Sequence, residues 1–160
     1  MNSEQIFKFM LKHNDRIHGH FLGVYARNQI PASDKFSRYP AYFISNTDTA
    51  SGSGKHWVVF YFSSPTQLEF FDSFAHISSD YGFKTLSLLY PNLQEIVYVN
   101  RRIQNYNSRV CGHYCIYFLV HRIHNYSLDQ IICSFSFHDT VWNDIQVFRF
   151  IKQLIKNEFD

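Results

Sequence analysis

The spacing of hydrophobic residues along the 160-residue chain first indicates a helix and then an extended segment. Ile6 and Phe9 recur at helical spacing after the polar start at Ser3, which predicts a capped amphipathic helix that ends near Asn14. Residues 20–31 (HFLGVYARNQIP) then alternate between apolar and polar positions. This alternation predicts a short extended segment.

Apolar runs bounded by turn residues predict the strands of a sheet, at residues 39–46, 56–63, 67–74 and 94–100. The run HWVVFYFS at 56–63 is apolar on both faces, which is typical of a central strand. The turn SPT that follows favours antiparallel pairing with the next run, in a meander.

Three later segments carry a helical pattern. Residues 80–90 are the first, and residues 109–124 form a longer, mostly apolar stretch that predicts a buried central helix with Ser108 or Asn107 as its N-cap. The third helix is expected to begin at Asn143.

Composition supports one folded domain that covers residues 1–160. Hydrophobic residues make up 46% of the chain and aromatic residues 19%, which excludes a disordered protein. The formal net charge is +2 and no block of like charges occurs, so charge alone does not indicate a nucleic-acid-binding protein. The apolar runs are too short to span a bilayer, and we expect no membrane association and a monomer.

The cysteine pattern indicates reduced thiols. Three cysteines are an odd number, and no apolar signal segment stands at the start, so we expect an intracellular protein without a disulfide framework. Cys115 and Cys133 lie in apolar surroundings in the sequence and are expected to be buried.

His56 and Asp72 are expected to meet at one edge of the sheet. His56 opens one predicted strand and Asp72 closes the next. Because hairpin partners run in opposite directions, the start of the first strand and the end of the second lie side by side. An imidazole and a carboxylate are thereby brought within reach of each other.

Cys111 falls in the first turn of the predicted central helix, where unpaired N–H groups and the helix dipole stabilise a thiolate. With His56 as general base and Asp72 as the partner of the imidazole, it forms a candidate Cys–His–Asp triad. Gln104, on the loop before the helix, is positioned to pair its side-chain amide with the Cys111 backbone N–H in an oxyanion hole. Gly112 is expected to keep the space beside the thiol open.

Each of these residues also has an ordinary structural explanation. A lone Cys is most often a small core residue, His56 a half-exposed structural histidine, and Asp72 a turn residue. The combination of complementary roles at converging positions favours a catalytic site over these separate explanations.

A metal site is the weaker alternative. Its candidate ligands would be Cys111, His113, Cys115, His121 and His124. Two cysteines three residues apart inside one helix depart from the loop-borne spacing of zinc knuckles, and no second cysteine pair exists, so we expect no metal.

The motifs that carry these residues resemble the adenovirus-type (adenain-like) cysteine proteases, most closely those encoded by Maverick/Polinton elements and adintoviruses. The resemblance covers most of the chain and rests on segments in the family's order: NSEQIFKFML, FLGVYARNQIP, AYFISNTDTASGSGKHWVVFYF, EFFDSF, RRIQNYNSRVCGHYCIYFLVHR and WNDIQVFRFI. It implies an α+β fold of papain-like topology with permuted chain order, in which a central mixed sheet is flanked by helices and the nucleophile starts a buried helix.

Carried over residue by residue, the resemblance makes Cys111 the nucleophile, His56 the base, Asp72 the imidazole partner and Gln104 the oxyanion-hole side chain. Adenovirus enzymes have Glu where this chain has Asp72, whereas the Maverick-type and SUMO-protease patterns have Asp. Trp57 follows the base as in the family and is expected to wall the site.

Two glycines complete the candidate substrate-binding residues. Gly112 lies beside the nucleophile, and Gly23 permits a turn or a close approach of another backbone.

The resemblance further implies endopeptidase cleavage of capsid or virion precursor proteins, and a location in the host nucleus and the virion. No cofactor is required for the chemistry. Adenovirus enzymes are activated by DNA and by a peptide, so both are possible partners here. A local basic patch for DNA would combine Lys84, Arg101, Arg102 and Arg109, although scattered basic residues are usually solvated surface.

Two alternatives stay open. A protease that removes SUMO or another ubiquitin-like modifier uses the same order of catalytic residues, but the chain is short for it. A non-catalytic capsid or DNA-binding protein on a protease fold is the other, and the presence of all four catalytic residue types argues against it.

Overall fold

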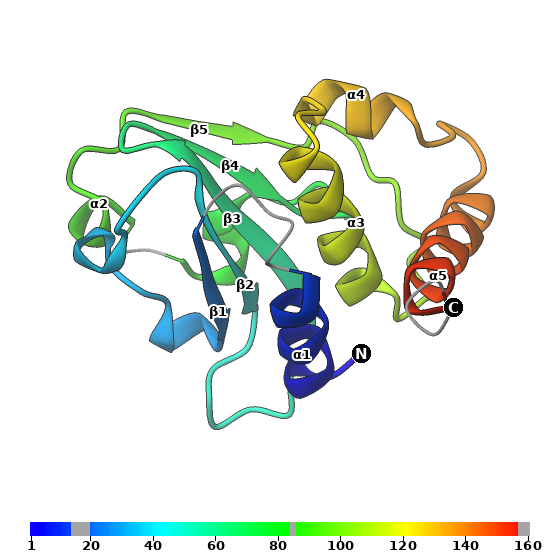
Figure 1. Ribbon diagram of the computed structural model, residues 1–160, viewed down its shortest axis with the longest axis horizontal. Coiled ribbons are helices and arrows are strands. Elements are labelled where there is room, and N and C mark those ends of the chain that lie inside the picture. Colours follow the sequence, from blue (N-terminus) through cyan, green and yellow to red (C-terminus); the bar gives the residue numbers. More distant parts are fainter. Residues whose placement is uncertain (14–19, 84–85, 157–160) are drawn as a thin grey trace.

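A five-stranded mixed sheet forms the centre of the computed structural model, which describes residues 1–13, 20–83 and 86–156 (Figure 1). The strands lie in chain order across the sheet: β1 (His20–Tyr25), β2 (Ala41–Asn46), β3 (Trp57–Ser64), β4 (Gln67–Phe71) and β5 (Glu95–Tyr98). Each strand predicted from the apolar runs is present, and β3 is the central strand as predicted.

The pairing directions make the sheet mixed. β2, β3 and β4 form the predicted antiparallel meander, in which Val59 of β3 lies between Ile44 of β2 and Phe71 of β4. The two edge strands are parallel to their neighbours, β1 to β2 and β5 to β4.

Both faces of the sheet are covered, which explains why its central strands are apolar on both faces. One hydrophobic cluster joins alternate strand residues such as Ile44 and Val59 to the long helices α1 (Ser3–His13), α3 (Cys111–Ile123) and α5 (Thr140–Lys156). The second cluster joins the intervening residues, such as Phe43, to the short helix α2 (Leu86–Leu89) on the opposite face (Figure 1).

Helix α1 is confirmed, but its cap differs from the prediction. Asn2 and Gln5 cap each other reciprocally: the Gln5 N–H donates to the Asn2 side chain and the Asn2 N–H to the Gln5 side chain, both at 2.9 Å. The N-cap is therefore Asn2 and not Ser3. The predicted end near Asn14 lies outside the described residues.

Helix α3 begins at Cys111, later than predicted, and its N-cap is Val110, which has no side-chain capping bond. The expected cap, Ser108, is engaged elsewhere, because its hydroxyl donates to the Asn105 carbonyl and accepts from Gln104. Cys111 is consequently the first residue of the helix.

Helix α5 begins at Thr140, earlier than the predicted start at Asn143. The Asp139 side chain accepts the Trp142 N–H at 2.8 Å and so caps the helix. Asn143 is fully buried, and its side chain bridges the Ile103 carbonyl and the backbone of Ser136.

Two further helical segments differ from the prediction. Helix α4 (Leu128–Cys133), closed by a capping box of Ser127 and Gln130, was not predicted. The predicted helix at 80–90 is instead a 3-10 helix at Ser78–Tyr81 and the single turn of α2, with residues 84 and 85 outside the described chain. Two more 3-10 turns, Arg27–Gln29 and Ser33–Lys35, lie between β1 and β2.

Candidate active site

His56 and Asp72 meet at the edge of the sheet where the hairpin geometry places them. His56 immediately precedes β3 and Asp72 immediately follows β4. The Nε2 atom of His56 lies 2.6 Å from Oδ1 of Asp72, and the two side chains are 8% and 0% exposed. A hydrogen bond between an imidazole and a buried carboxylate is short and strong, because one partner carries charge.

The Asp72 carboxylate is held by further donors on both oxygens. Oδ1 also accepts the Phe74 N–H at 2.9 Å. Oδ2 accepts the His76 N–H at 3.0 Å and the Tyr81 hydroxyl at 2.7 Å. The backbone turn after β4 and one tyrosine thus fix the carboxylate against rotation.

Tyr81 was not among the predicted site residues. It belongs to the 3-10 helix Ser78–Tyr81, a segment that the hydrophobic pattern assigned to a helix without indicating a site. Its ring also lies 5.7 Å from the His56 ring, and Phe74 stacks on the imidazole at 4.7 Å between ring centroids. The His56 ring is therefore confined by two aromatic side chains as well as by Asp72.

Cys111 completes the group of three side chains, because it lies close enough to His56 for each group to shift the pKa of the other. Since Nε2 of the imidazole is bonded to Asp72, Nδ1 is the nitrogen that remains for the thiol. The backbone N–H groups of Trp57 and Gly112 also stabilise the sulfur in its anionic form. The first position of α3 adds the positive end of the helix dipole.

The electrostatics favour a thiolate–imidazolium pair. Burial acts to raise the pKa of Cys111, but the hydrogen bond and charge of His56 outweigh it and lower the pKa. Burial likewise acts to lower the pKa of His56, and the hydrogen bonds with Asp72 and Cys111 reverse this effect and raise the pKa to about 9. The pKa of Asp72 is lowered because its bonds to His56, Phe74 and Tyr81 exceed the cost of burial.

The two other cysteines lack these features. Cys115 is fully buried one turn further along α3, as predicted, and burial raises its thiol pKa well above the ordinary value. Cys133 was predicted to be buried and is exposed. It ends α4, whose neighbouring Ile131 and Ile132 face the core, so the helical rotation turns the next side chain outward.

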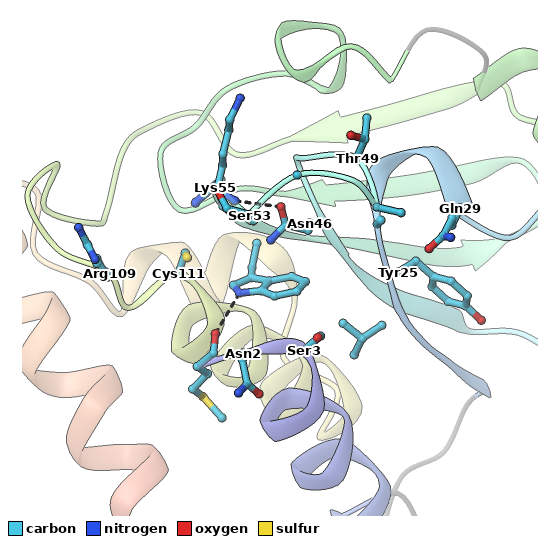
Figure 2. Close-up of a pocket in the computed structure, with 18 of the residues that line it drawn as sticks. Asn2, Ser3, Tyr25, Gln29, Asn46, Thr49, Ser53, Lys55, Arg109 and Cys111 are labelled. Carbon is cyan, nitrogen blue, oxygen red and sulfur yellow. Dashed lines mark hydrogen bonds between the residues drawn. The ribbon is translucent and has the colours of Figure 1, made fainter.

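Cys111 and His56 face an open cleft of about 840 Å³ (Figure 2). Arg109 and Lys55 lie at the Cys111 end of this cleft, and Tyr25 and Gln29 lie toward the other end. The start of α1 forms one wall, and the loop between β2 and β3 forms the opposite wall.

The loop that forms this wall is fixed by its own polar side chains. Oδ1 of Asn46 accepts the N–H groups of Asp48 and Lys55, at 2.8 and 3.0 Å, and so joins the two ends of the loop. The Asp48 carboxylate accepts the N–H groups of Thr49 and Gly54. Lys55 is thereby held directly before His56.

The three candidate substrate-binding residues have different positions. Trp57 lines the cleft, and its Nε1 donates to the Met1 carbonyl at 3.2 Å. Gly112 faces α1 and Trp57, because a Cβ atom added at this position would lie 3.1 Å from Cδ1 of Ile6. The absence of a side chain therefore allows α1 and α3 to pack closely. It does not leave the open space beside the thiol that was expected. Gly23, with a φ of 134°, forms the bulge in β1 two residues before the cleft residue Tyr25.

Gln104 reaches the same cleft and is buried. Its Oε1 accepts the Ser73 hydroxyl at 2.6 Å, and its Nε2 donates to the carbonyl and hydroxyl oxygens of Ser108, at 3.2 and 3.1 Å. The amide is therefore oriented with its NH₂ group toward the segment that leads into Cys111.

The basic residues expected to form one patch have separate environments. Arg101 lies over the Phe137 ring and donates to the Ile132 carbonyl, and Arg102 lies over the Tyr106 ring. Arg109 is in the cleft lining, and Lys84 lies outside the described residues.

The described part of the chain contains neither a cluster of metal ligands nor a helix that could cross a membrane. No group of three or more His, Cys, Asp or Glu side chains in residues 1–13, 20–83 and 86–156 is arranged to hold a metal ion. Over the same residues, no helix has the length and apolar character that a bilayer crossing requires.

The chain has structural similarity to solved proteins but no match at the level of sequence families. No protein-family model matches the chain, and no curated protein matches it. Among solved structures, the chain is similar to a selenomethionine crystal structure of the ASFV pS273R protease, with 23% sequence identity and a TM-score of 0.40. The match covers 64% of this chain and 41% of that protease, so this chain matches less than half of the other protein.

Proposed function

We propose that this protein is a cysteine endopeptidase in which Cys111 is the nucleophile, His56 the general base and acid, and Asp72 the residue that orients the imidazole. The observation that carries the proposal is the buried His56–Asp72 hydrogen bond, with His56 and Cys111 together in the lining of an open cleft and Cys111 at the start of α3.

In the first step, Sγ of Cys111 attacks the carbonyl carbon of the scissile peptide bond, and a tetrahedral oxyanion forms. The carbon–nitrogen bond then breaks as the His56 imidazolium donates its proton to the leaving amine. The products of this step are a thioester on Cys111, a free amine and a neutral His56.

In the second step, His56 accepts a proton from a water molecule that attacks the thioester. The carbon–sulfur bond breaks, the carboxylic acid product leaves, and the thiolate–imidazolium pair is restored. Asp72 keeps its position throughout, because four hydrogen-bond donors hold its two oxygens.

Gln104 is proposed to stabilise the oxyanion together with the Cys111 backbone N–H. The Ser108 hydroxyl accepts a hydrogen bond from Nε2 of Gln104 and donates one to the Asn105 carbonyl. When the oxyanion replaces Ser108 as the acceptor for Gln104, Ser108 can keep its bond to Asn105. Ser73 would hold the other end of the amide and so prevent it from flipping.

The biological substrate is proposed from the sequence resemblance. We infer that the enzyme processes capsid or virion precursor proteins of a virus or virus-like mobile element of the Maverick/Polinton type. The chain order His56, Asp72, Cys111 supports the permuted papain-like topology that this resemblance implies. Activation by DNA or by a peptide, and action in the nucleus or virion, are proposed on the same basis.

Alkylation by iodoacetamide between pH 5 and 9, with mass spectrometry to locate the adduct, tests the catalytic pair. We expect the alkylation profile of Cys111 to lie at lower pH than that of an ordinary thiol, because its thiolate is stabilised. Cys133 is an exposed thiol of the same chain and serves as the internal reference. His56→Ala should move the Cys111 profile to higher pH and leave the Cys133 profile unchanged.

A Cys111 that alkylates no faster than Cys133 at any pH would refute the catalytic pair. Hydrolysis of denatured protein substrates by the wild type and not by Cys111→Ala would then establish the peptidase reaction itself. A ubiquitin-like protein with a C-terminal Gly-Gly extension, cleaved in preference to capsid-type peptides, would redirect the proposal to a deconjugating enzyme.

A further inference from the structure

Apart from the Cys111 thiolate, the charged side chains of the cleft lining are all basic. Lys55 and Arg109 are part of the lining, and His56 adds positive charge when it is protonated. None of the described residues that line the cleft is an aspartate or a glutamate.

Neither cation is neutralised by a carboxylate of the described residues. Lys55 and Arg109 are both exposed, and across residues 1–13, 20–83 and 86–156 neither has an ion-pair partner. Arg102, close to Arg109 in sequence, is different, because its guanidinium lies 3.9 Å from the centroid of the Tyr106 ring and donates to the Gln104 carbonyl.

Two acidic residues on the segments around the cleft, Asp72 and Asp48, are committed to other contacts. Asp72 is fully buried behind His56, to which it is bonded. Asp48 lies in the loop of the cleft wall, and its oxygens accept backbone N–H groups of that same loop. Neither carboxylate is directed at Lys55 or Arg109.

The positions of the two cations place them next to the reacting groups. Lys55 directly precedes His56, and the loop that carries it is fixed by Asn46. Arg109 stands two residues before Cys111, at the same end of the cleft (Figure 2). A peptide whose scissile bond lies against Cys111 therefore has its neighbouring side chains within reach of both.

We propose that the cleft selects peptides with acidic side chains close to the scissile bond, and that Lys55 and Arg109 provide this selectivity. The proposal rests on the proposed peptidase function and names the substrate chemistry of the same cleft. The carboxylates of the substrate would take the place of the ion-pair partners that these two residues lack. A substrate with lysine or arginine at the same positions would meet like charges and bind poorly.

The first test measures the charge selectivity at Cys111 without any knowledge of the cleavage site. Iodoacetate and iodoacetamide alkylate a thiolate by the same displacement of iodide, and they differ by one negative charge. The rate with iodoacetate divided by the rate with iodoacetamide, both measured at Cys111, reports the local electrostatic potential. We expect this ratio to fall about threefold for Lys55→Gln and again for Arg109→Gln, and further for the glutamate variants.

Controls separate this effect from the imidazolium and from overall charge. The His56 charge is present in every variant, so only the change between variants counts. Lys152→Glu on α5 changes the net charge by the same amount as Lys55→Glu or Arg109→Glu. Because Lys152 lies outside the cleft lining, this variant should leave the rate ratio unchanged. Addition of about 0.5 M salt should reduce the difference between wild type and the Lys55 and Arg109 variants.

The second test uses the wild-type enzyme on a library of peptides made from denatured cell proteins, with the cleavage sites read by mass spectrometry. We expect Asp and Glu to be enriched within about three residues of the cleaved bond, and Lys55→Glu with Arg109→Glu to reverse the preference toward Lys and Arg.

The outcomes distinguish the two proposals. A rate ratio that is the same in wild type and both Gln variants would overturn the acidic selectivity, even if Cys111 is highly reactive and peptides are cleaved. A Cys111 as slow as Cys133 toward iodoacetamide would overturn the peptidase, whatever the ratio.

Discussion

At the scale of single residues, the orientation of the imidazole depends on how firmly Asp72 is held. Three of its four donors come from the backbone or from His56, and the fourth is the Tyr81 hydroxyl at 2.7 Å. We infer that Tyr81 is a positioning residue, which acts on His56 through Asp72.

Tyr81→Phe tests this role, because it removes the hydroxyl and keeps the ring beside His56. The Asp72 carboxylate loses a donor on Oδ2, so its pKa rises and it is held less firmly. We expect the imidazole to be less well oriented toward Cys111, and the alkylation profile of Cys111 to move to higher pH. We expect a loss of about 1–2 kcal/mol in the free energy of urea unfolding. Tyr90→Phe is the matched control, since its hydroxyl donates to the Pro31 carbonyl on the other face of the sheet. An equal shift of the Cys111 profile in both variants would mean that Tyr81 has no special role.

A thiolate at Cys111 should be visible directly. Thiolates absorb near 240 nm and thiols do not, so the difference spectrum between wild type and Cys111→Ala should show this band at pH 7, below the ordinary Cys pKa of 9.0. The band should decrease strongly in the His56→Ala background, where the hydrogen bond and the positive charge are both absent. If the band appears only above pH 9, Cys111 is a neutral thiol in the resting protein.

The three residues of the candidate triad were predictable because each depends on local geometry. A hairpin places the start of one strand beside the end of the next, and a helix start stabilises an anion. Tyr81, Ser73 and Ser108 were not predictable, because their roles arise from side-chain contacts between segments that no periodicity relates.

At the scale of elements, the sheet and the long helices were predictable, and the short helices were not. The strands are long apolar runs that face two clusters, which gives a strong signal. Helix α4 has 6 residues, too few for a helical period to be distinguished from chance. The start of α5 was misplaced because Asn143, a residue type favoured at N-caps, is used here as a buried bridge.

Helix α4 depends on its capping box, which gives a prediction at this scale. In Ser127→Ala, the Gln130 N–H loses its side-chain acceptor, and we expect the free energy of unfolding to decrease by about 1 kcal/mol. Ser127→Asp retains an acceptor and should recover most of the loss. Because α4 lies away from the cleft lining, Cys111 alkylation should be the same in all three proteins. Equal destabilisation by alanine and aspartate would show that the cap contributes little.

At the scale of the whole molecule, the titration of the active-site pair has opposite effects that cancel over a range of pH. The raised His56 pKa contributes stability that is present below pH 6.5 and lost as the pH rises through about 9. The lowered Cys111 pKa contributes stability that is present above pH 9.0 and lost as the pH falls. In the range below pH 9 where the folded protein holds a thiolate and an imidazolium, the pair carries the same number of protons as a neutral imidazole and a thiol in the unfolded chain. The pair therefore adds no slope in this range.

Another histidine also contributes to the acid side of the stability curve. His113 on α3 has a buried Nδ1 without a hydrogen-bond partner, and burial lowers its pKa to about 4. Its contribution is present above pH 6.5 and is lost as the pH falls toward 4, because the unfolded chain binds the proton first. We expect the free energy of urea unfolding to fall as the pH decreases below 6.5. His113→Gln should remove roughly 1–2 kcal/mol of that fall, after allowance for partial exposure. The same acid slope in His113→Gln and wild type would assign the fall to other groups, such as Asp72 and Cys111.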